Sequence, residues 1–185
     1  MRLVDSTYEF IKEEVTDLFT RYDIRCIPIS GFELATKMGM ILIPYSALTA
    51  KKLEAAKKVS TDGFYLEPGD GKEYIYYNDQ VEYERCNMTI LHEIGHAVLG
   101  HSEDTDTEIA EAEAAFFAKY AVAPPPLTHK VQLECPEEIA DVFCISYEAS
   151  QYAWGYYCNW KKFHAAYGKF TPYEIKLNML YGITA

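Results

Sequence analysis

The short sequence HEIGH at positions 92–96 constrains this chain more than any other feature. Its two histidines are four residues apart, so a helix places both imidazoles on one face, one turn above the other. Two imidazoles in that arrangement can bind one tetrahedral zinc ion. Apolar residues around the motif recur at helical spacing and supply a buried face: Ile90, Leu91, Ile94, Val98 and Leu99. The pattern therefore predicts a helix that carries part of a metal site.

Glu93 gives this predicted site its chemistry. It follows the first histidine, so its carboxylate points to the side of the ligand face and takes no coordination position. Zinc lowers the pKa of a bound water to roughly 7, and a nearby carboxylate can take the proton of that water during attack on a peptide carbonyl. We therefore predict one zinc ion per chain, with His92 and His96 as ligands and Glu93 as the catalytic general base and acid.

The third metal ligand is less constrained, because a catalytic zinc has three protein ligands and one open position. The downstream pair Gly100 and His101 is one position out of register for the metzincin pattern, which excludes that class, and His101 is predicted as a cap or surface residue. In the acidic helix that follows, Glu113 shares an inward stripe with Phe117. A buried charge is costly unless it is paired or bound to metal. We predict Glu113 as the third ligand, with Glu111 as the alternative.

Composition narrows the class of protein. The chain has 185 residues, 49% of them hydrophobic, which is enough for a core in one domain or in one domain with a small appendage. Its formal net charge of −11 repels phosphate backbones, so direct nucleic acid binding is not expected. Five cysteines without a C-x-x-C pair are typical of a reduced cytosolic protein. With no apolar leader or membrane-length run, we expect a cytoplasmic protein without membrane association.

Hydrophobic periodicity and turn residues predict a helix-rich α+β chain. Helices are expected over residues 5–22, 31–38, 46–58, 85–99 and 105–122, and near 136–145, 147–166 and 172–180. Strands are expected over 40–45, 63–67 and 73–78. The last two form a hairpin around Pro68–Gly71, and its second arm is expected to be an edge strand that pairs with extended substrate. Ser30 and Ser46 are predicted helix N-caps, and Gly39 and Gly100 are predicted helix ends.

Two segments of the chain resemble signatures of the ImmA/IrrE family of metallopeptidases. Residues 85–101 contain HEIGH, flanked by Arg-x-x-Met-Thr and Leu-Gly-His, and residues 111–118 read Glu-x-Glu-Ala-x-x-Phe-Ala. The resemblance covers about residues 1–126. Met88 stands where the family often has an aromatic residue, and Leu91 where it has a small one, and both are apolar exchanges on a core face. The resemblance implies a gluzincin-like site with the zinc ligands and base named above.

The resemblance also implies a fold and a division of the chain. We expect a zincin-like metallopeptidase domain over residues 1–126, with a small antiparallel sheet packed on the motif helix. The helix-breaking stretch Pro124–Pro126 marks the expected boundary. Residues 127–185 are expected to form a helical, helix-turn-helix-like region packed on that domain. Its predicted second helix has no basic residue before Lys161, so it lacks the side chains that read DNA.

Function is likewise implied by the resemblance. Characterised family members are cytosolic proteases that cut a helix-turn-helix repressor and so switch on mobile-element or stress genes. We therefore expect a zinc-dependent endopeptidase with such a repressor as its protein substrate. The alternative is a regulatory or antitoxin-type binding protein that keeps the fold and holds a repressor or toxin without cutting it. The donor to the oxyanion stays open among several residues: Tyr76, Tyr77, His129, Tyr147 and His164.

Overall fold

A computed structural model describes residues 2–69, 71–102 and 104–182, with the side chains of residues 165–167 left out of the description. The described chain is a helix-rich α+β structure with a small sheet, which confirms the predicted fold class. It divides into two compact units. The first unit comprises Met1–Leu3 and Ser30–Ala118, and the second comprises Val4–Ile29 and Lys119–Ala185. These units do not coincide with the predicted ranges 1–126 and 127–185, because the first helix of the chain clusters with the C-terminal helices.

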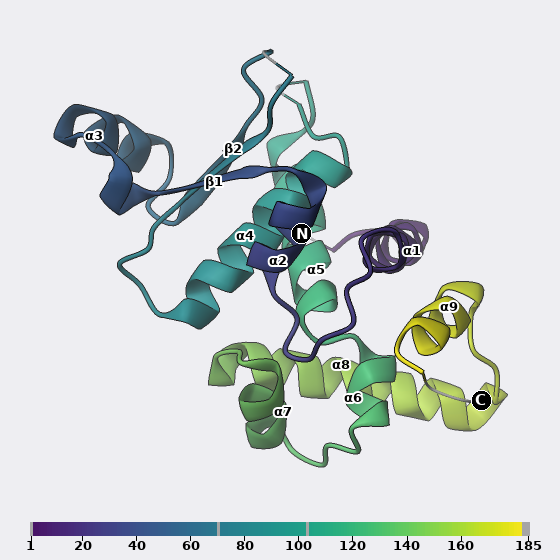
Figure 1. Cartoon of the computed structure of the whole chain (residues 1–185). Coiled ribbons are helices and arrows are strands. Elements are labelled where there is room, and N and C mark those ends of the chain that lie inside the picture. Colours follow the sequence, from purple (N-terminus) through teal and green to yellow (C-terminus); the bar gives the residue numbers. More distant parts are fainter. Residues whose placement is uncertain (1, 70, 103, 183–185) are drawn as a thin grey trace. The chain divides into compact units, whose positions relative to one another are not determined.

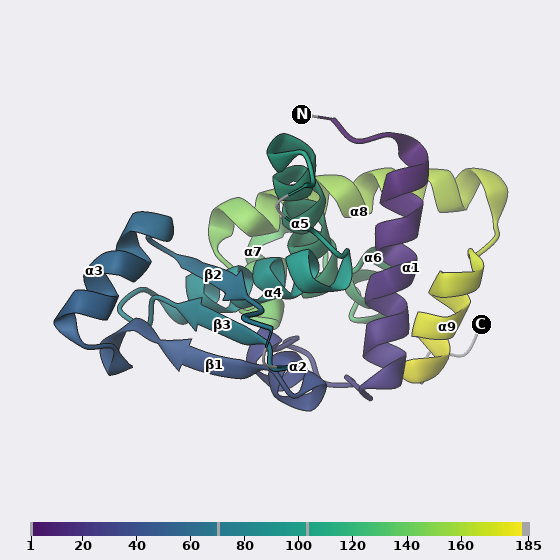
Figure 2. The same cartoon turned by 90° about the horizontal axis from the view of Figure 1, so that it is seen from above.

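The first unit contains a three-stranded mixed sheet. Its strands are β1 (Ile41–Pro44), β2 (Gly63–Leu66) and β3 (Tyr74–Tyr77), in the order β1-β3-β2 (Figure 2). β3 pairs parallel with β1 and antiparallel with β2, so only the predicted hairpin is antiparallel. The prediction that residues 73–78 form an edge strand is wrong, because β3 is bonded on both sides and β2 is an edge. The turn expected at Pro68–Gly71 includes Asp70, which lies outside the described residues.

The helical elements of the first unit are α2 (Gly31–Met38), the short 3-10 helix η1 (Tyr45–Ala47), α3 (Ala50–Val59), α4 (Tyr83–Val98) and α5 (Thr107–Val122), whose last turn belongs to the second unit. α2 has the predicted ends: the Ser30 hydroxyl accepts the backbone N–H of Glu33, and Gly39 has a φ of 84°. The predicted cap at Ser46 is wrong. Its N–H and hydroxyl instead donate to the carboxylate of Asp79, and α3 begins later in the chain.

The motif helix α4 is packed tightly from two directions in the first unit. A Cβ added at Gly31 would lie 3.1 Å from side-chain atoms of Ile90 and Leu91 on α4. A Cβ added at Gly95, inside the motif, would lie 3.1 Å from the ring and Cβ of Phe117 on α5. Both positions are therefore tighter than ordinary van der Waals contact for any larger residue. The missing side chain of Gly95 lets α5 approach α4 closely beside the histidines.

The second unit is helical, with helices α1 (Asp5–Arg21), α6 (Pro125–Lys130), α7 (Pro136–Phe143), α8 (Tyr147–Tyr167) and α9 (Pro172–Leu180). α6 and α7 pack against α8, and α9 packs against α1 (Figure 1). The Nζ of Lys176 lies 2.7 Å from a carboxylate oxygen of Asp17, which ties α9 to α1. The tri-proline stretch starts α6 as well as ending α5, because proline fits the first turn of a helix. None of the described helices is long and apolar enough to cross a membrane.

Candidate metal centre

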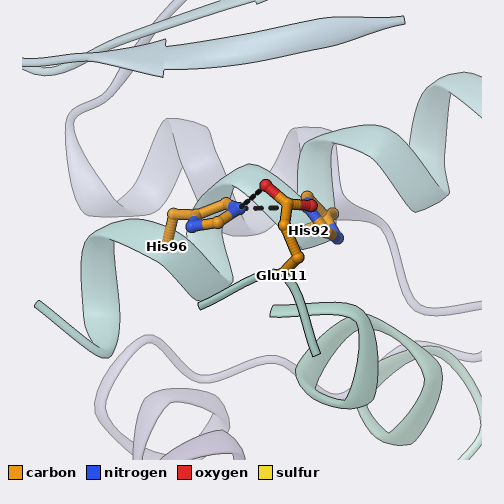
Figure 3. A group of neighbouring side chains, drawn as sticks. All are labelled: His92, His96 and Glu111. Atoms are coloured by element: carbon orange, nitrogen blue, oxygen red, sulfur yellow. Dashed lines mark hydrogen bonds and ion pairs between the residues drawn. The ribbon is translucent and has the colours of Figure 1, made fainter. Parts of the chain in front are cut away.

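The two histidines of the motif and one glutamate converge in the first unit. His92 and His96 lie one turn apart on α4, and their Nε2 atoms are 3.0 Å from each other. The carboxylate of Glu111 on α5 faces both rings (Figure 3). One of its oxygens lies 3.3 Å from His92 Nε2 and the other 3.5 Å from His96 Nε2. The three groups can offer ligand atoms that all lie within 4.8 Å of one another.

Glu113, the third ligand predicted from the sequence, does not lie in this group. Its Oε2 is instead 2.9 Å from Nε2 of His101, and that histidine is only 6% exposed rather than a surface residue. The prediction placed the ligand on the most buried stripe of α5. That stripe, with Ala114 and Phe117, packs on the apolar side of α4. A ligand for two half-buried rings must flank the stripe, as Glu111 does with a side chain 59% exposed.

Glu93 lies beside the histidines with its side chain turned toward the sheet. The residue is 8% exposed, and its Oε2 accepts the backbone N–H of Tyr65 on β2 at 2.8 Å. Burial raises the pKa of Glu93 to about 7; the hydrogen bond from Tyr65 acts in the opposite direction, and the nearby charge of Glu111 adds to the rise. Its other oxygen is free of that backbone contact, so the carboxyl group can exchange a proton near the two imidazoles.

The electrostatics of the histidines suit a metal site. Burial lowers the pKa of His92, and burial followed by repulsion from His92 lowers the pKa of His96 to about 4. Both rings are therefore neutral at pH 7, the state in which an imidazole can ligate a metal. Two neutral imidazoles and a carboxylate form a ligand set that zinc prefers, and the residues present fit the ion.

A cavity of about 530 Å³ opens over this group in the first unit. The edge strand β2 contributes Gly63 and Phe64 to its wall, and α4 contributes Arg85 and Met88. The guanidinium of Arg85 donates two hydrogen bonds to the carboxylate of Asp62, each with a nitrogen–oxygen distance of 2.9 Å. The site is thus a partly apolar groove with the candidate ligands and Glu93 along its floor.

Two candidate oxyanion donors, Tyr76 and Tyr77, belong to β3 in this same unit. The ring of Tyr76 stacks on Phe64 with centroids 4.8 Å apart, and the ring of Tyr77 meets Phe32 edge-on at 5.5 Å. Neither tyrosine lines the cavity. Their rings therefore serve packing of the sheet, and the oxyanion donor remains unassigned.

The fold and the site define a metallopeptidase-like protein. The model of the family Peptidase_M78, described as the IrrE N-terminal-like domain, matches residues 52–154. The match covers more than half of the chain, so the chain belongs to this family. It includes the motif helix, the acidic helix and the hairpin, and it confirms the resemblance found in the sequence. A search of curated proteins found no match to the chain.

Proposed function

We propose that the protein is a zinc-dependent endopeptidase with His92, His96 and Glu111 as zinc ligands and Glu93 as general base and acid. The observation that carries this proposal is the convergence of two neutral imidazoles and a carboxylate within 4.8 Å, with a buried glutamate beside them. Membership of a metallopeptidase-like family supports it independently. The predicted ligand Glu113 is replaced in this proposal by the alternative, Glu111.

The residues of the site have separate tasks in peptide hydrolysis. A bound zinc ion would supply Lewis-acid activation of water at neutral pH. Glu93 takes the proton of the attacking water and passes it to the leaving amine. The N–H of Tyr65 holds one oxygen of that carboxylate, which leaves the other oxygen for the proton. The burial of Glu93 keeps bulk water from competing for this contact.

The edge strand β2 is the proposed binding strand for the substrate. Its pairing with β3 alternates, so the backbone groups of Phe64 and Leu66 face β3 while those of Gly63 and Tyr65 face outward. The outward N–H of Tyr65 reaches Glu93, which places this edge directly at the catalytic carboxylate. The outward N–H of Gly63 is likewise taken, by the hydroxyl of Ser60. An extended peptide that adds to β2 would therefore donate to the outward carbonyls of Gly63 and Tyr65, and it would run past the candidate metal site.

The proposed substrate is a helix-turn-helix repressor whose cutting releases mobile-element or stress genes from repression. Family membership supports this substrate class. The formal net charge of −11 supports it as well, because a repressor binds DNA through a basic surface, which an acidic protein attracts. No direct contact of this chain with nucleic acid is part of the proposal.

The test is co-expression of the chain with the helix-turn-helix repressor encoded nearest to it, with the intact mass of the repressor as readout. The parent is compared with Glu93→Gln and with the control Glu148→Gln, an exposed site on α8. A single new cut that needs Glu93 supports the proposal. An intact repressor that co-purifies with the chain favours the alternative, a non-cleaving binding protein. If the repressor is neither cut nor bound by the chain, the proposed substrate class is wrong.

A further inference from the structure

A chain of ring contacts leads away from the candidate metal site. Nδ1 of His96 lies 2.9 Å from Nδ1 of His101, and Nε2 of His101 lies 2.9 Å from Oε2 of Glu113. The two rings meet at an interplanar angle of 72° with centroids 5.0 Å apart, so the contact joins nitrogen to nitrogen and is not a stack. His101 and Glu113 thus form a second layer of polar groups behind His96.

The backbone after α4 explains how His101 reaches this position. Gly100 has a φ of 68°, a left-handed conformation that other residues rarely adopt, and it ends the helix. The N–H of His101 then donates to the carbonyl of His96 at 3.1 Å. This short return brings the ring of His101 back against the ring of His96 instead of leaving it in solvent.

The contacts permit one arrangement of protons when the rings are neutral and Glu113 is ionised. A carboxylate only accepts, so His101 must carry its hydrogen on Nε2. Its Nδ1 is then an acceptor, because a neutral imidazole has a single N–H. Nδ1 of His96 must therefore donate, which leaves the lone pair of His96 on Nε2. That is the nitrogen that faces His92 and Glu111.

Burial makes this arrangement effective. The side chain of His101 is 6% exposed and that of Glu113 is 21% exposed, so water competes little for their contacts. Hydrogen bonds shielded from water hold their donors and acceptors in fixed orientations more strongly than exposed ones do. The alternating glutamates of α5 have different tasks in consequence: Glu111 faces the candidate site, and Glu113 faces the histidine behind it.

We propose that His101 and Glu113 are positioning residues that fix the tautomer and ring orientation of His96, so that its Nε2 is ready for a divalent metal before the metal arrives. The inference rests on the proposed function, because it concerns the same metal site. Partners of this kind orient metal-ligating histidines in many proteins, and their loss typically weakens metal binding roughly 10–100-fold. His101 is proposed to act through its contact with His96, and Glu113 through its contact with His101.

The first test is the zinc dissociation constant of the purified full chain, measured by competition with a chromophoric chelator. His101→Leu removes both contacts and is expected to weaken zinc binding roughly 10–100-fold. His101→Asn places an amide oxygen where Nδ1 stands, so it keeps an acceptor for His96 and is expected to recover part of the loss. Glu148→Gln, at an exposed position of α8 in the second unit, is the control, and it should bind zinc as the parent does. Circular dichroism of each variant verifies its fold.

The second test reads the tautomers directly in the metal-free parent, by long-range proton–nitrogen correlation spectra of the imidazole rings. The expected result is a hydrogen on Nδ1 of His96 and on Nε2 of His101. A hydrogen on Nε2 of His96 would overturn the inference even if every variant failed to fold. This measurement needs no metal and no substrate, so a merely structural role for His101 cannot imitate its result.

The outcomes separate this inference from the proposed function. If the parent and His101→Leu bind zinc equally while His92→Ala binds none, the metal site stands and the positioning role is overturned. If the parent binds no zinc, the proposed function fails and the positioning role falls with it. Weakened binding in His101→Leu, with partial recovery in His101→Asn, supports both.

Discussion

The contacts inside the first compact unit of this chain differ in kind from those inside the second. In the first unit, helices α4 and α5 approach closely through Gly95, and polar groups are gathered where they meet. In the second, aromatic rings lie between helices; the ring of His129 on α6, for example, lies against that of Trp160 on α8 with centroids 5.5 Å apart. The group able to hold a metal lies in the first unit, and the described part of the second contains none of this kind. In the first unit, therefore, we expect the polar groups of the candidate site to lower the stability of the fold.

The substitution Glu93→Gln should have the largest effect, which is on the rate of cleavage. An amide cannot take a proton from water, so the cleavage rate should fall about 10²–10⁴-fold while zinc content is unchanged. Rates from repressor cleavage and zinc content from elemental analysis measure both. Glu148→Gln, on an exposed position of α8 in the second unit, should leave both quantities as they are. Equal rates for the parent and Glu93→Gln would contradict the role of Glu93.

The same substitution should stabilise the metal-free protein at high pH. The pKa of Glu93 is raised from 4.5 to about 7 by burial, so its ionisation opposes folding. The contribution of Glu93 to the free energy of unfolding is therefore most favourable below pH 4.5, and it is lost as the pH rises through 7. Glu93→Gln should therefore be more stable than the parent by roughly 2–3 kcal/mol at pH 8, and by almost nothing at pH 4. Urea denaturation at the two pH values measures this, and a pH-independent difference would contradict it.

Gly63→Ala should destabilise the protein by about 1–3 kcal/mol, since an added Cβ overpacks the first unit. It would lie 2.6 Å from the backbone oxygen of Tyr76 and 2.6 Å from the methyl group of Thr89. The strand cannot move away without breaking its pairing with β3. The midpoint of urea denaturation, followed by circular dichroism, measures the change. An unchanged midpoint would show that β2 is held more loosely than described.

Gly155→Ala should have the smallest effect and the opposite sign. Gly155 is exposed within α8 of the second unit, and an added Cβ there meets nothing within 4 Å. Alanine favours a helix over glycine, so the variant should gain about 0.5–1 kcal/mol. The same denaturation experiment measures it. A loss of stability would indicate that this face of α8 is covered, contrary to its exposure.

Much of the fold follows from local signals in the sequence. The ends of α2 were predictable because Ser30 and Gly39 act through contacts within a few residues. The motif helix was predictable from its apolar spacing. The central position of β3 was not, because the pairing of β1 with β3 joins segments that are distant in the chain. The clustering of the first helix with the C-terminal helices could not be predicted either, because it also depends on contacts between distant segments.

The candidate site shows the same limit. Residues His92, Glu93 and His96 are close in sequence, and their helical spacing alone fixes their relation. The proposed third ligand comes from another helix, so its identity depends on how α5 is rotated about its axis. Burial periodicity locates the packed stripe of α5 but does not tell which flank faces the histidines. In the structure Glu111 faces His92 and His96 while Glu113 faces His101, and the two glutamates are two residues apart on nearly opposite sides of the helix.

The most direct test of the account is the zinc dissociation constant of Glu111→Ala measured beside that of Glu113→Ala. Both variants lose one carboxylate from the same helix, so charge and helix propensity change alike. The account predicts that Glu111→Ala, which removes a ligand, loses far more affinity than Glu113→Ala, which removes a partner of His101. If Glu113→Ala loses more zinc affinity than Glu111→Ala, the assignment of the metal site is wrong.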